Sequence, residues 1–425
     1  MNILFINLKD IQGGAAIAAY RLNKGLEKYH HTENHLIVNH KFSTDPNVFS
    51  ILHHTSETVQ TVKTFIQFMV NKFFNRFGLQ YVYIPFSPSF ILKKVRELKP
   101  DIISLHITHG GYFPTALIKK LSKIAPIVWT LHDMWPFTAN AVHTFGDESW
   151  KQLRSGRCEK IIYPHIGVDT GKWLLKRKKR IYAKSRFQVV APSRWMQGLA
   201  TQSPVFENKT VHYITHGLDL DGFKPLDKMA CKKAVGLPSN EPVFMFSSAD
   251  DLERSAWKGG QLLVDVLTAI DSLIPSNAPI HVLVLGKGKL TRLQHLKNLQ
   301  MHQLGHIESE TCIRTLLNAS DLFIYPTRAD SLGLVLVESI ACGVPAITFD
   351  VGGPADVIED GYNGYLIPPF DVSAFAIRTM ELLQDTSKRE LFSVQAREYA
   401  CRHFDLELMA QKYINVFKNM CEGNL

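Results

Sequence analysis

The sequence contains little cysteine, and its cysteines do not form recognisable pairs. Six cysteines are scattered over 425 residues, and no C-x-x-C spacing occurs among them. This pattern argues against a disulfide framework, so we expect reduced thiols, several of them in the core of a cytosolic protein. No clustered set of His, Cys and Asp has ligand spacing either, and we expect no metal site.

Long apolar runs are also missing. No stretch of about 18 consecutive apolar residues occurs, so no segment is expected to span a bilayer. The chain opens directly on MNILFINL without a basic leader, and we expect no secretory signal. The sequence shows no low-complexity linker and no repeat period, so short ordered connections should join its domains.

The bulk properties are those of a globular protein. A chain of 425 residues is long enough for two ordinary domains, because single cores stop growing well below this length. Hydrophobic residues make up 45% and charged residues 20%, which argues against disorder. The net charge of +9 suits nucleotide phosphates, an acidic membrane surface or nucleic acid, without choosing among them.

Apolar strands alternate with helices along the chain. Strands are predicted for NILFINL, HLIVNH, DIISLH, PIVWTLHD and FQVVAPS in the first half, and for PVFMFSSAD, IHVLVLGKG, DLFIYPT and PAITFDVGG in the second. This alternation predicts an α/β protein with doubly wound parallel sheets. The segment HYITHGLDLDGFKP is expected to cross between the two domains.

The most informative segment is ADSLGLVLVESIACGVP, at positions 329–345. It places Asp330 and Glu338 eight residues apart around a glycine-containing turn, between a strand that precedes it and a strand that follows. One βαβ unit would bring both carboxylates to the carboxyl-end crevice, where open parallel sheets bind ligands. The alternative is a surface acid and an unrelated acid near a helix N-terminus.

A second turn, Gly13–Gly14, follows the first predicted strand. Glycine permits positive φ and lets backbone amides at a helix N-terminus approach an anion closely. The alternative is a tight βα turn with no ligand. The turn is not a GxGxxG, and no acid-bearing second strand follows at the dinucleotide spacing, so a nicotinamide site is not expected.

Taken together, these motifs resemble the retaining glycosyltransferases of GT-B architecture, in the family 4-like branch of bacterial polysaccharide biosynthesis. The resemblance covers nearly the whole chain and is carried by INLKDIQGGAAIAAYRLNKGL, TLHDMWPFT, SSADDLERSAWKGG and the acid pair. The family usually has Glu where this chain has Asp330. The resemblance implies two facing Rossmann-like domains: an acceptor domain at 1–217 with a returning C-terminal helix at 405–425, and a donor domain at 218–404.

In the acceptor domain, the resemblance places His132 close to the reacting sugar or its phosphate. An imidazole suits a sugar hydroxyl and can be tuned near neutral pH. Asp133 would orient a hydroxyl or the imidazole, and Trp135 and Phe137 would offer an apolar face to a sugar ring. The alternative is a strand-end histidine beside two core aromatics.

In the donor domain, the resemblance assigns charge and hydroxyl contacts. Lys258 and Arg254 would contact the donor diphosphate, although Arg254 lies one residue closer to the lysine than is common in the family. Asp330 would touch the donor sugar and Glu338 the ribose. The remaining donor contacts implied are Gly13, Gly14, Gly286, His306, Ile307, Ser331, Leu332, Gly333 and Leu334, with the loop at Gly305 holding the nucleobase. A solvated charged loop is the alternative for the basic pair.

The implied reaction is metal-independent and retaining, with no cofactor beyond a UDP- or GDP-sugar donor. The acceptor would be a saccharide or polyprenyl-linked saccharide in surface polysaccharide or glycolipid synthesis. One rival is a nucleotide-sugar epimerase or sugar phosphorylase on the same fold. Another is a non-catalytic basic protein that binds membranes or nucleic acid; no nucleic-acid motif accompanies the basic residues, so nucleic acid is not expected.

Two segments bear on location. An apolar stripe runs at helical spacing through 62–77, where Phe68 and Phe74 widen the apolar face. The segment KWLLKRKKRIYAKSR at 172–186 carries eight positive charges and no acid. Together they suggest a cytoplasmic protein that docks peripherally on an anionic membrane surface. A core helix and a solvated charge run are the alternatives.

Overall fold

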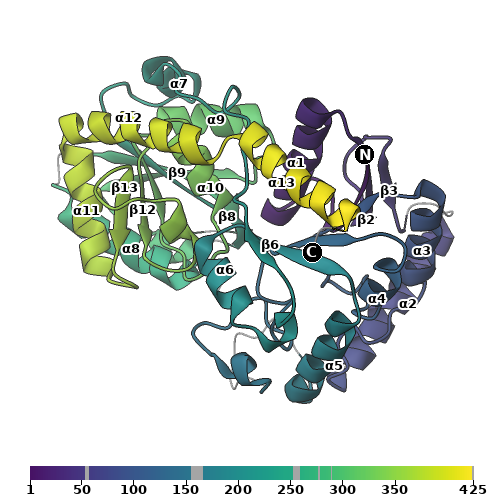
Figure 1. Cartoon of the computed structure of the whole chain (residues 1–425). Coiled ribbons are helices and arrows are strands. Elements are labelled where there is room, and N and C mark those ends of the chain that lie inside the picture. Colours follow the sequence, from purple (N-terminus) through teal and green to yellow (C-terminus); the bar gives the residue numbers. More distant parts are fainter. Residues whose placement is uncertain (53–56, 155–165, 252–258, 276–277, 289, 424–425) are drawn as a thin grey trace. The chain divides into compact units, whose positions relative to one another are not determined.

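The computed structural model divides into two compact units (Figure 1). The first consists of Met1–Gly217 and Glu407–Leu425, and the second of Leu218–Leu406. The structure describes residues 1–52, 57–154, 166–251, 259–275, 278–288 and 290–423. Each unit is built around its own parallel sheet, as the alternation of strands and helices predicted.

A seven-stranded sheet forms the centre of the first unit. Its strands are β1 (Asn2–Lys9), β2 (Glu33–His40), β3 (Val48–Ser50), β4 (Ile102–Leu105), β5 (Ile127–Thr130), β6 (Phe187–Ala191) and β7 (Val211–Tyr213). They lie in the order β3-β2-β1-β4-β5-β6-β7, and all neighbouring pairs are parallel. All carboxyl ends therefore meet at one edge. The strand order reverses between β1 and β4, the point at which such sheets bind ligands.

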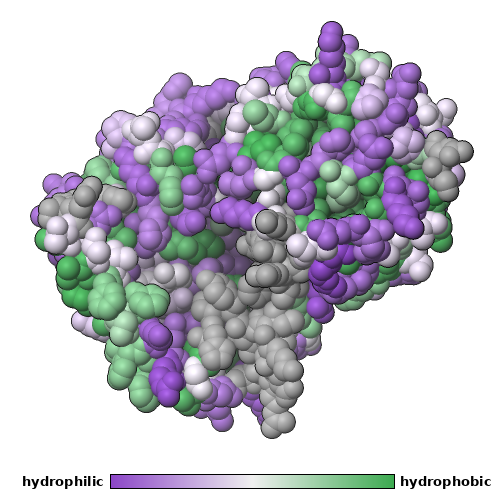
Figure 2. Space-filling view, turned by 180° about the vertical axis from the view of Figure 1, so that it is seen from behind, coloured by the Kyte–Doolittle hydropathy of each residue, from purple (hydrophilic) through white to green (hydrophobic). Residues whose placement is uncertain are grey.

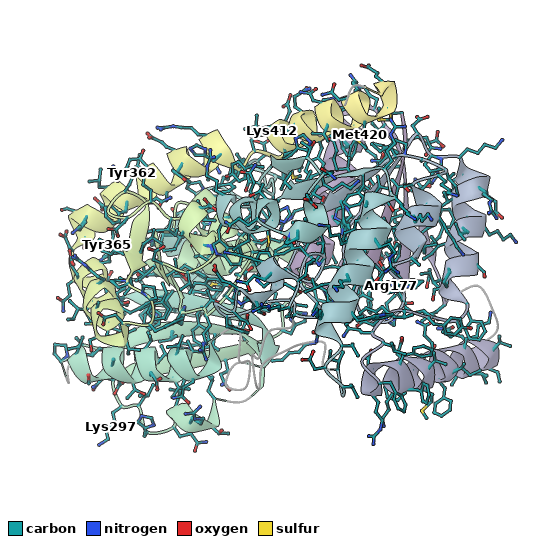
Figure 3. The ribbon with its side chains drawn as sticks, turned by 60° about the horizontal axis from the view of Figure 1, so that its bottom comes forward. Arg177, Lys297, Tyr362, Tyr365, Lys412 and Met420 are labelled. Carbon is teal, nitrogen blue, oxygen red and sulfur yellow. The ribbon has the colours of Figure 1, made fainter. Side chains whose placement is uncertain are left out.

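The helices of this unit include the last helix of the chain. They are α1 (Gly14–His30), α2 (Glu57–Arg76), α3 (Ser87–Leu98), α4 (Leu117–Leu121), α5 (Gly171–Ala183), α6 (Arg194–Thr201) and α13 (Leu406–Glu422), with short 3₁₀ turns η1 (Ser149–Gln152) and η2 (Pro204–Phe206). The hydroxyls of Tyr413 in α13 and Thr130 in β5 lie 2.9 Å apart. The Arg186 guanidinium donates to the carbonyl of Met420, which Figure 3 labels. The predicted return of the C-terminal helix to the first unit is thereby confirmed.

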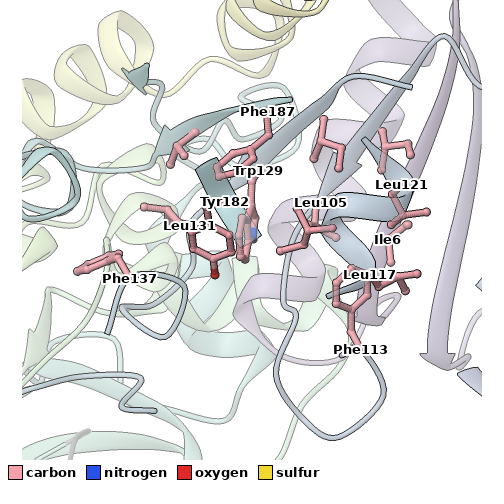
Figure 4. Packing of buried hydrophobic residues seen from close by; sticks show 14 of the residues in the cluster. Ile6, Leu105, Phe113, Leu117, Leu121, Trp129, Leu131, Phe137, Tyr182 and Phe187 are labelled. Atoms are coloured by element: carbon pink, nitrogen blue, oxygen red, sulfur yellow. The ribbon is translucent and has the colours of Figure 1, made fainter. Parts of the chain in front are cut away.

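The core of the first unit is built on its central strands. All four residues of β5 are buried, as expected for a parallel strand with helices on both faces. The indole of Trp129 packs edge-on against Tyr182 of α5 at 5.6 Å and against Phe187 of β6 at 5.9 Å between ring centroids (Figure 4). These aromatics anchor α5 to the sheet, so α5 holds its place through apolar burial.

The second unit contains a six-stranded parallel sheet. Its strands are β8 (Val243–Asp251), β9 (Ile280–Lys287), β10 (Leu299–Gly305), β11 (Leu322–Tyr325), β12 (Ala346–Phe349) and β13 (Gly364–Ile367). They lie in the order β10-β9-β8-β11-β12-β13, so the reversal falls between β8 and β11. The surrounding helices are α7 (Lys228–Ala234), α8 (Gly260–Leu273), α9 (Glu310–Ala319), α10 (Leu334–Ala341), α11 (Val372–Gln384) and α12 (Thr386–His403), with 3₁₀ turns η3 (Thr291–Leu293) and η4 (Gly353–Asp356).

Three strands were not predicted from the sequence. β3 and β13 are only three and four residues long, too short to show a period. β10 is an edge strand in which only Leu299 is buried, so it lacks the apolar pattern of a buried strand. Edge strands are the hardest to recognise because one side contacts no neighbouring strand.

Two further sequence expectations concern cysteines and membranes. The five cysteines in the described part of the chain are free thiols, and Cys231 and Cys342 among them are buried. Cys158 lies outside the described residues. None of the helices that the structure describes has the length and apolarity needed to cross a bilayer.

Candidate active site

At the reversal point of the second sheet, Gly259, which precedes α8, contacts the backbone that follows β11. Arg254 and Lys258, which come before it in the chain, lie outside the described residues. Gly259, directly after Lys258, has φ +76°, and a Cβ on it would lie 2.1 Å from the carbonyl oxygen of Pro326. Only glycine therefore fits where the start of α8 meets the end of β11.

The acid turn after β11 is held from two sides. The hydroxyl of Tyr325 donates to Oδ2 of Asp330 at 2.6 Å, and the amide of Gly353 donates to the Asp330 carbonyl at 3.0 Å. Gly352 has φ +63°, and a Cβ on Gly353 would lie 1.9 Å from the carbonyl oxygen of Ser331. The glycine pair after β12 thus packs directly against the acid turn. The sequence showed this glycine turn but not its contact with Asp330.

The helix that follows carries the second acid. Gly333 caps α10 with φ +86°, and the helix begins at Leu334. Ser331 and Leu332 therefore lie in the turn just before the cap, next to the positive end of the helix dipole. Glu338 lies on α10 and is only 9% exposed. Burial, with the nearby Glu338 carboxylate, raises the pKa of the Cys342 thiol to about 12.

The remaining predicted donor residues of this unit lie at the ends of the neighbouring strands. Gly286 is the second-last residue of β9, and His306 and Ile307 follow β10 directly. Ile307 packs against the core, while His306 is exposed, with Nε2 3.7 Å from an Oε1 of Glu308. Since all six strands are parallel, the structure brings these residues and the acid turn to the same edge of the sheet.

In the first unit, the glycine turn lies at the corresponding edge. Gly13 has φ +93° and caps α1, and Gly14 is the first residue of the helix. Among the described residues other than its chain neighbours, no heavy atom lies within 4 Å of the position that a Cβ on Gly13 would occupy. Just before the turn, the fully buried carboxylate of Asp10 accepts from the amides of Phe42 and Ser43 at 3.0 and 2.8 Å. Gly13 and Gly14 belong to this unit, whereas the other proposed donor contacts belong to the second.

His132 belongs to a cluster of three histidines at the same edge. Nε2 of His132 lies 3.0 Å from Nδ1 of His106, which follows β4, and Nε2 of His106 lies 3.1 Å from the hydroxyl of Ser104. The ring of His216, which follows β7, stacks on His132 at 5.2 Å between centroids. Nδ1 is the other ring nitrogen of His132, and it has no hydrogen bond to any described residue. It can therefore bind a ligand.

Burial keeps the imidazoles of His106 and His132 neutral. Desolvation, with a contribution from His216, lowers the pKa of His106 to about 3. Desolvation and the neighbouring His216, His106 and His109 also lower the pKa of His132 well below its ordinary value. At neutral pH, His132 therefore offers a hydrogen bond without carrying a charge.

The residues after His132 differ from expectation. Asp133 accepts from His109 Nε2 at 2.7 Å and from the amide of Trp135 at 2.8 Å, so it orients His109 rather than His132. Trp135 and Phe137 are fully buried, and Trp135 Nε1 donates to Gln80 at 2.8 Å. The prediction that both rings face a sugar was wrong, because the core encloses both of them.

Four residues near His132 were not singled out from the sequence. His106, His109 and His216 follow strand ends, and polar residues at consecutive strand ends were the available signal. The sequence gave no signal for Lys178: this residue is only 3% exposed, and its ammonium group donates to the carbonyls of Trp135 and Thr138 at 2.5 and 2.9 Å. Within the described ranges, no group of His, Cys, Asp or Glu could hold a metal ion.

Comparison with known families gives two matches. Residues 12–221 match the family model described as Glycosyltransferase Family 4, and residues 228–399 match the one described as Glycosyl transferases group 1. The first match lies almost entirely within the first unit and the second within the second. Together they include every candidate residue described above.

Curated relatives match over part of the chain. Identity is 27% over 220 residues to the N-acetyl-alpha-D-glucosaminyl L-malate synthase of Bacillus anthracis, covering 51% of this chain and 56% of that protein. It is 26% over 224 residues to the GDP-mannose-dependent monoacylated alpha-(1-6)-phosphatidylinositol monomannoside mannosyltransferase of Corynebacterium glutamicum, covering 49% and 56%. The chain thus spans about half the length of the curated relatives it matches.

Solved structures match over the whole chain. The crystal structure of Anabaena Alr3699/HepE in complex with UDP and glucose superposes with a TM-score of 0.66 at 18% identity, covering 99% of this chain and 100% of that one. Sucrose-phosphate synthase from Thermosynechococcus elongatus superposes with a TM-score of 0.69 at 16% identity, covering 99% of each chain. Likeness at this identity concerns the fold, and it confirms the predicted α/β architecture of two Rossmann-like units.

Proposed function

The chain belongs to the GT-B glycosyltransferases of the family 4 type, and on this premise we propose that it transfers a sugar from a nucleotide-sugar donor to a saccharide or lipid-linked saccharide, with retention of anomeric configuration. In this proposal the second unit binds the donor and the first unit binds the acceptor. Each unit contributes the carboxyl edge of its own sheet, where ligands of open α/β sheets bind.

The observation that supports the donor site best is the rigid acid turn of the second unit. Tyr325 and Gly353 hold Asp330 by its carboxylate and its backbone, and Glu338 is buried on the helix that the turn begins. Carboxylates accept hydrogen bonds from sugar hydroxyls, and a fixed carboxylate loses little entropy when it binds one. We assign Asp330 to the hydroxyls of the donor sugar and Glu338 to those of the ribose.

The diphosphate needs positive charge. Lys258 and Arg254 supply it in place of a metal ion, because a planar guanidinium and an ammonium both suit phosphate oxygens. The amides around Ser331 to Leu334, at the positive end of α10, stabilise the charge that grows on the leaving group. Gly286, His306 and Ile307 line the place of the nucleobase.

The bonds and protons of the proposed reaction balance without a cofactor. A hydroxyl oxygen of the acceptor bonds to the anomeric carbon on the face from which the diphosphate leaves. The bond between that carbon and the phosphate oxygen breaks, and the departing phosphate takes the hydroxyl proton. The products are a glycoside and a nucleoside diphosphate. His132 holds a sugar hydroxyl through Nδ1 and remains neutral throughout, as its lowered pKa requires.

The relatives indicate which donors to try first. One solved neighbour holds UDP and glucose, and one curated relative is named for GDP-mannose. A UDP- or GDP-sugar is therefore the proposed donor. We propose a cytoplasmic site of action and an acceptor destined for a bacterial surface polysaccharide or glycolipid.

A nucleotide panel followed by a transfer assay tests the function. UDP, GDP, ADP and CMP are added separately to the full chain, and one nucleotide should raise the unfolding temperature. A nucleotide concentration of about 100 times Kd corresponds to a stabilisation of the folded state by about 2.7 kcal/mol. The matching nucleotide sugar should then yield a glycoside only when an acceptor is present. Scrambling of the sugar without acceptor would show an epimerase instead, and stabilisation by none of the nucleotides would contradict the donor site.

A further inference from the structure

Helix α2 exposes its apolar side. Phe65, the most exposed large apolar residue of the helix, has 64% of its surface exposed. The other exposed large apolar residues of α2 and of the position just after it are Val59, Val62, Ile66, Phe68, Met69, Phe73 and Phe77. At 100° per residue, positions 62 to 77 of this set fall on one continuous side of the helix. Figure 2 shows hydrophobic residues gathered where α2 lies.

The side of α2 that faces its own unit is polar. Gln67, which is 7% exposed, donates to the carbonyl of Gly111 at 3.0 Å and accepts from the hydroxyl of Ser87 at 3.1 Å. Asn71, one turn later, donates to the same carbonyl at 2.8 Å. A surface helix of a globular protein normally places its apolar side against the core. Here the arrangement is inverted, so a core position does not explain the aromatic residues of α2.

A cationic helix adjoins the end of α2. The hydroxyl of Thr170 donates to the carbonyl of Gly78, and the amide of Gly167 donates to the carbonyl of Asn75 at 2.8 Å. These bonds tie the start of α5 to the end of α2. In α5 and at its C-cap, Lys172, Lys176, Arg180 and Lys184 are exposed at a spacing of four residues, so they form one row.

The cationic helix also carries an exposed aromatic side chain. Trp173, in the first turn of α5, is exposed and lies under the guanidinium of Arg177, which Figure 3 labels, at 5.9 Å from the ring centroid. No acidic residue occurs from 58 to 96 or from 170 to 206. Lys72 and Arg76 lie within the exposed side of α2, where long side chains can keep their charge at a polar boundary.

We propose that the exposed side of α2 and the cationic row of α5 form one docking face for an anionic lipid bilayer. Exposed Phe and Met insert into the boundary of the acyl chains, while the lysines and arginines meet anionic headgroups. A second copy of the chain is a poor occupant, because pairing two such faces would bring like charges together. The inference concerns attachment and does not depend on the proposed reaction.

The structure changes which cations belong to this face. Lys178 lies in the middle of the basic segment, but it is buried under Trp135, with Nζ 3.6 Å from the ring centroid. Lys179 pairs with Glu207 at 2.6 Å. Neutralising every cation of the basic segment 172–186 would therefore damage the core. The exposed row is the correct target.

Vesicle sedimentation of the full chain tests the proposal. Binding should rise with the phosphatidylglycerol content of phosphatidylcholine vesicles and fall with salt. Replacing Lys172, Lys176, Arg180 and Lys184 by Gln should weaken binding by about fivefold per cation at low salt. Replacing Phe65, Phe68 and Phe73 by Gln should weaken it by about tenfold per residue. These side chains are exposed, so both variants should keep the wild-type unfolding temperature.

Matched controls come from other exposed positions. Gln in place of Ile377, Leu391 and Val394 on α11 and α12, or in place of Lys224, Lys233, Lys297 and Lys412, should leave binding unchanged. Three results would overturn the proposal: no sedimentation with anionic vesicles at low salt, an equal loss of vesicle binding in the control variants, or vesicle binding that does not change with salt concentration. Sedimentation velocity without lipid adds a fourth: a dimer that becomes monomeric in the Phe variant would make a second copy the occupant.

Discussion

His106 and His132 follow the ends of the neighbouring strands β4 and β5, and their imidazoles share one hydrogen bond, Nδ1 to Nε2, of 3.0 Å. One nitrogen of this pair must donate and the other must accept, so the tautomers of the two rings depend on each other. The hydroxyl of Ser104 adds a further link at Nε2 of His106. His106 therefore positions His132 and determines whether its Nδ1 donates or accepts.

His132→Ala should lose sugar transfer and keep nucleotide affinity, because His132 belongs to the first unit, whereas the proposed contacts to the ribose, the diphosphate and the nucleobase belong to the second. A positioned group of this kind contributes about 100-fold or more to rate. Transfer assays and titration calorimetry with the nucleotide measure the two effects separately. An equal loss of nucleotide binding would show that His132 only supports the fold.

The buried His106 should make stability fall in acid. Its pKa is about 3 in the folded protein and about 6.5 in the unfolded chain, so the unfolded state alone takes up a proton between these values. The stabilisation that depends on a neutral His106 is fully present above a pH of about 6.5. Below this pH, the free energy of unfolding falls by about 1.4 kcal/mol per pH unit. Urea unfolding at several pH values should therefore show a shallower acid slope in His106→Asn. Identical slopes in both proteins would refute a neutral His106.

Glu338→Ala should weaken nucleotide binding while the fold survives. The proposed hydrogen bonds to ribose hydroxyls are worth about 1.5–3 kcal/mol each, so Kd should rise by at least about tenfold. Titration calorimetry measures this, and Glu390→Ala, at an exposed position of the same unit, is the control. Donor affinity equal to that of the control would remove Glu338 from the site.

Lys258→Ala should lower turnover more than donor binding, because charge on the leaving diphosphate grows toward the transition state. A loss of about 100-fold in kcat is expected for one such group. Arg254→Ala should act in the same direction, and Lys297→Ala, at an exposed lysine of the same unit, should change neither parameter. Normal turnover in the Arg254 variant would mean that another group supplies the second charge.

Gly353→Ala should destabilise the second unit and weaken donor binding, since the new Cβ would lie 1.9 Å from the carbonyl oxygen of Ser331. Forced displacement of the acid turn should cost about 2–4 kcal/mol. Gly198→Ala, in helix α6 with no atom within 4 Å of the new Cβ, is the control and should be neutral or slightly stabilising. Unfolding temperatures and nucleotide titration compare the two. A Gly353 variant as stable as its control would show that the turn can move.

Much of the fold could be predicted because it depends on local pattern. Continuous apolar runs such as Leu322–Tyr325 mark strands buried on both faces, and Gly333 marks the start of α10 through its positive φ. The acid pair could be placed at a sheet edge because chain order alone puts the turn after a parallel strand. Short or edge strands such as β10 were not predicted, because a repeating pattern of apolar residues needs both length and a buried face.

Contacts between distant segments were decided only by the tertiary structure. His106, His132 and His216 converge because β4, β5 and β7 end at the same edge of one parallel sheet, and no spacing in the chain records the order of its strands. Trp135 and Lys178 are buried against each other across two elements, although one resembled a ligand platform and the other a surface charge. The order of residues in α2 gives the helix an apolar side and a polar side. Which side faces water depended on whether Gln67 and Asn71 find a carbonyl to bind, and in the folded unit Gly111 provides it.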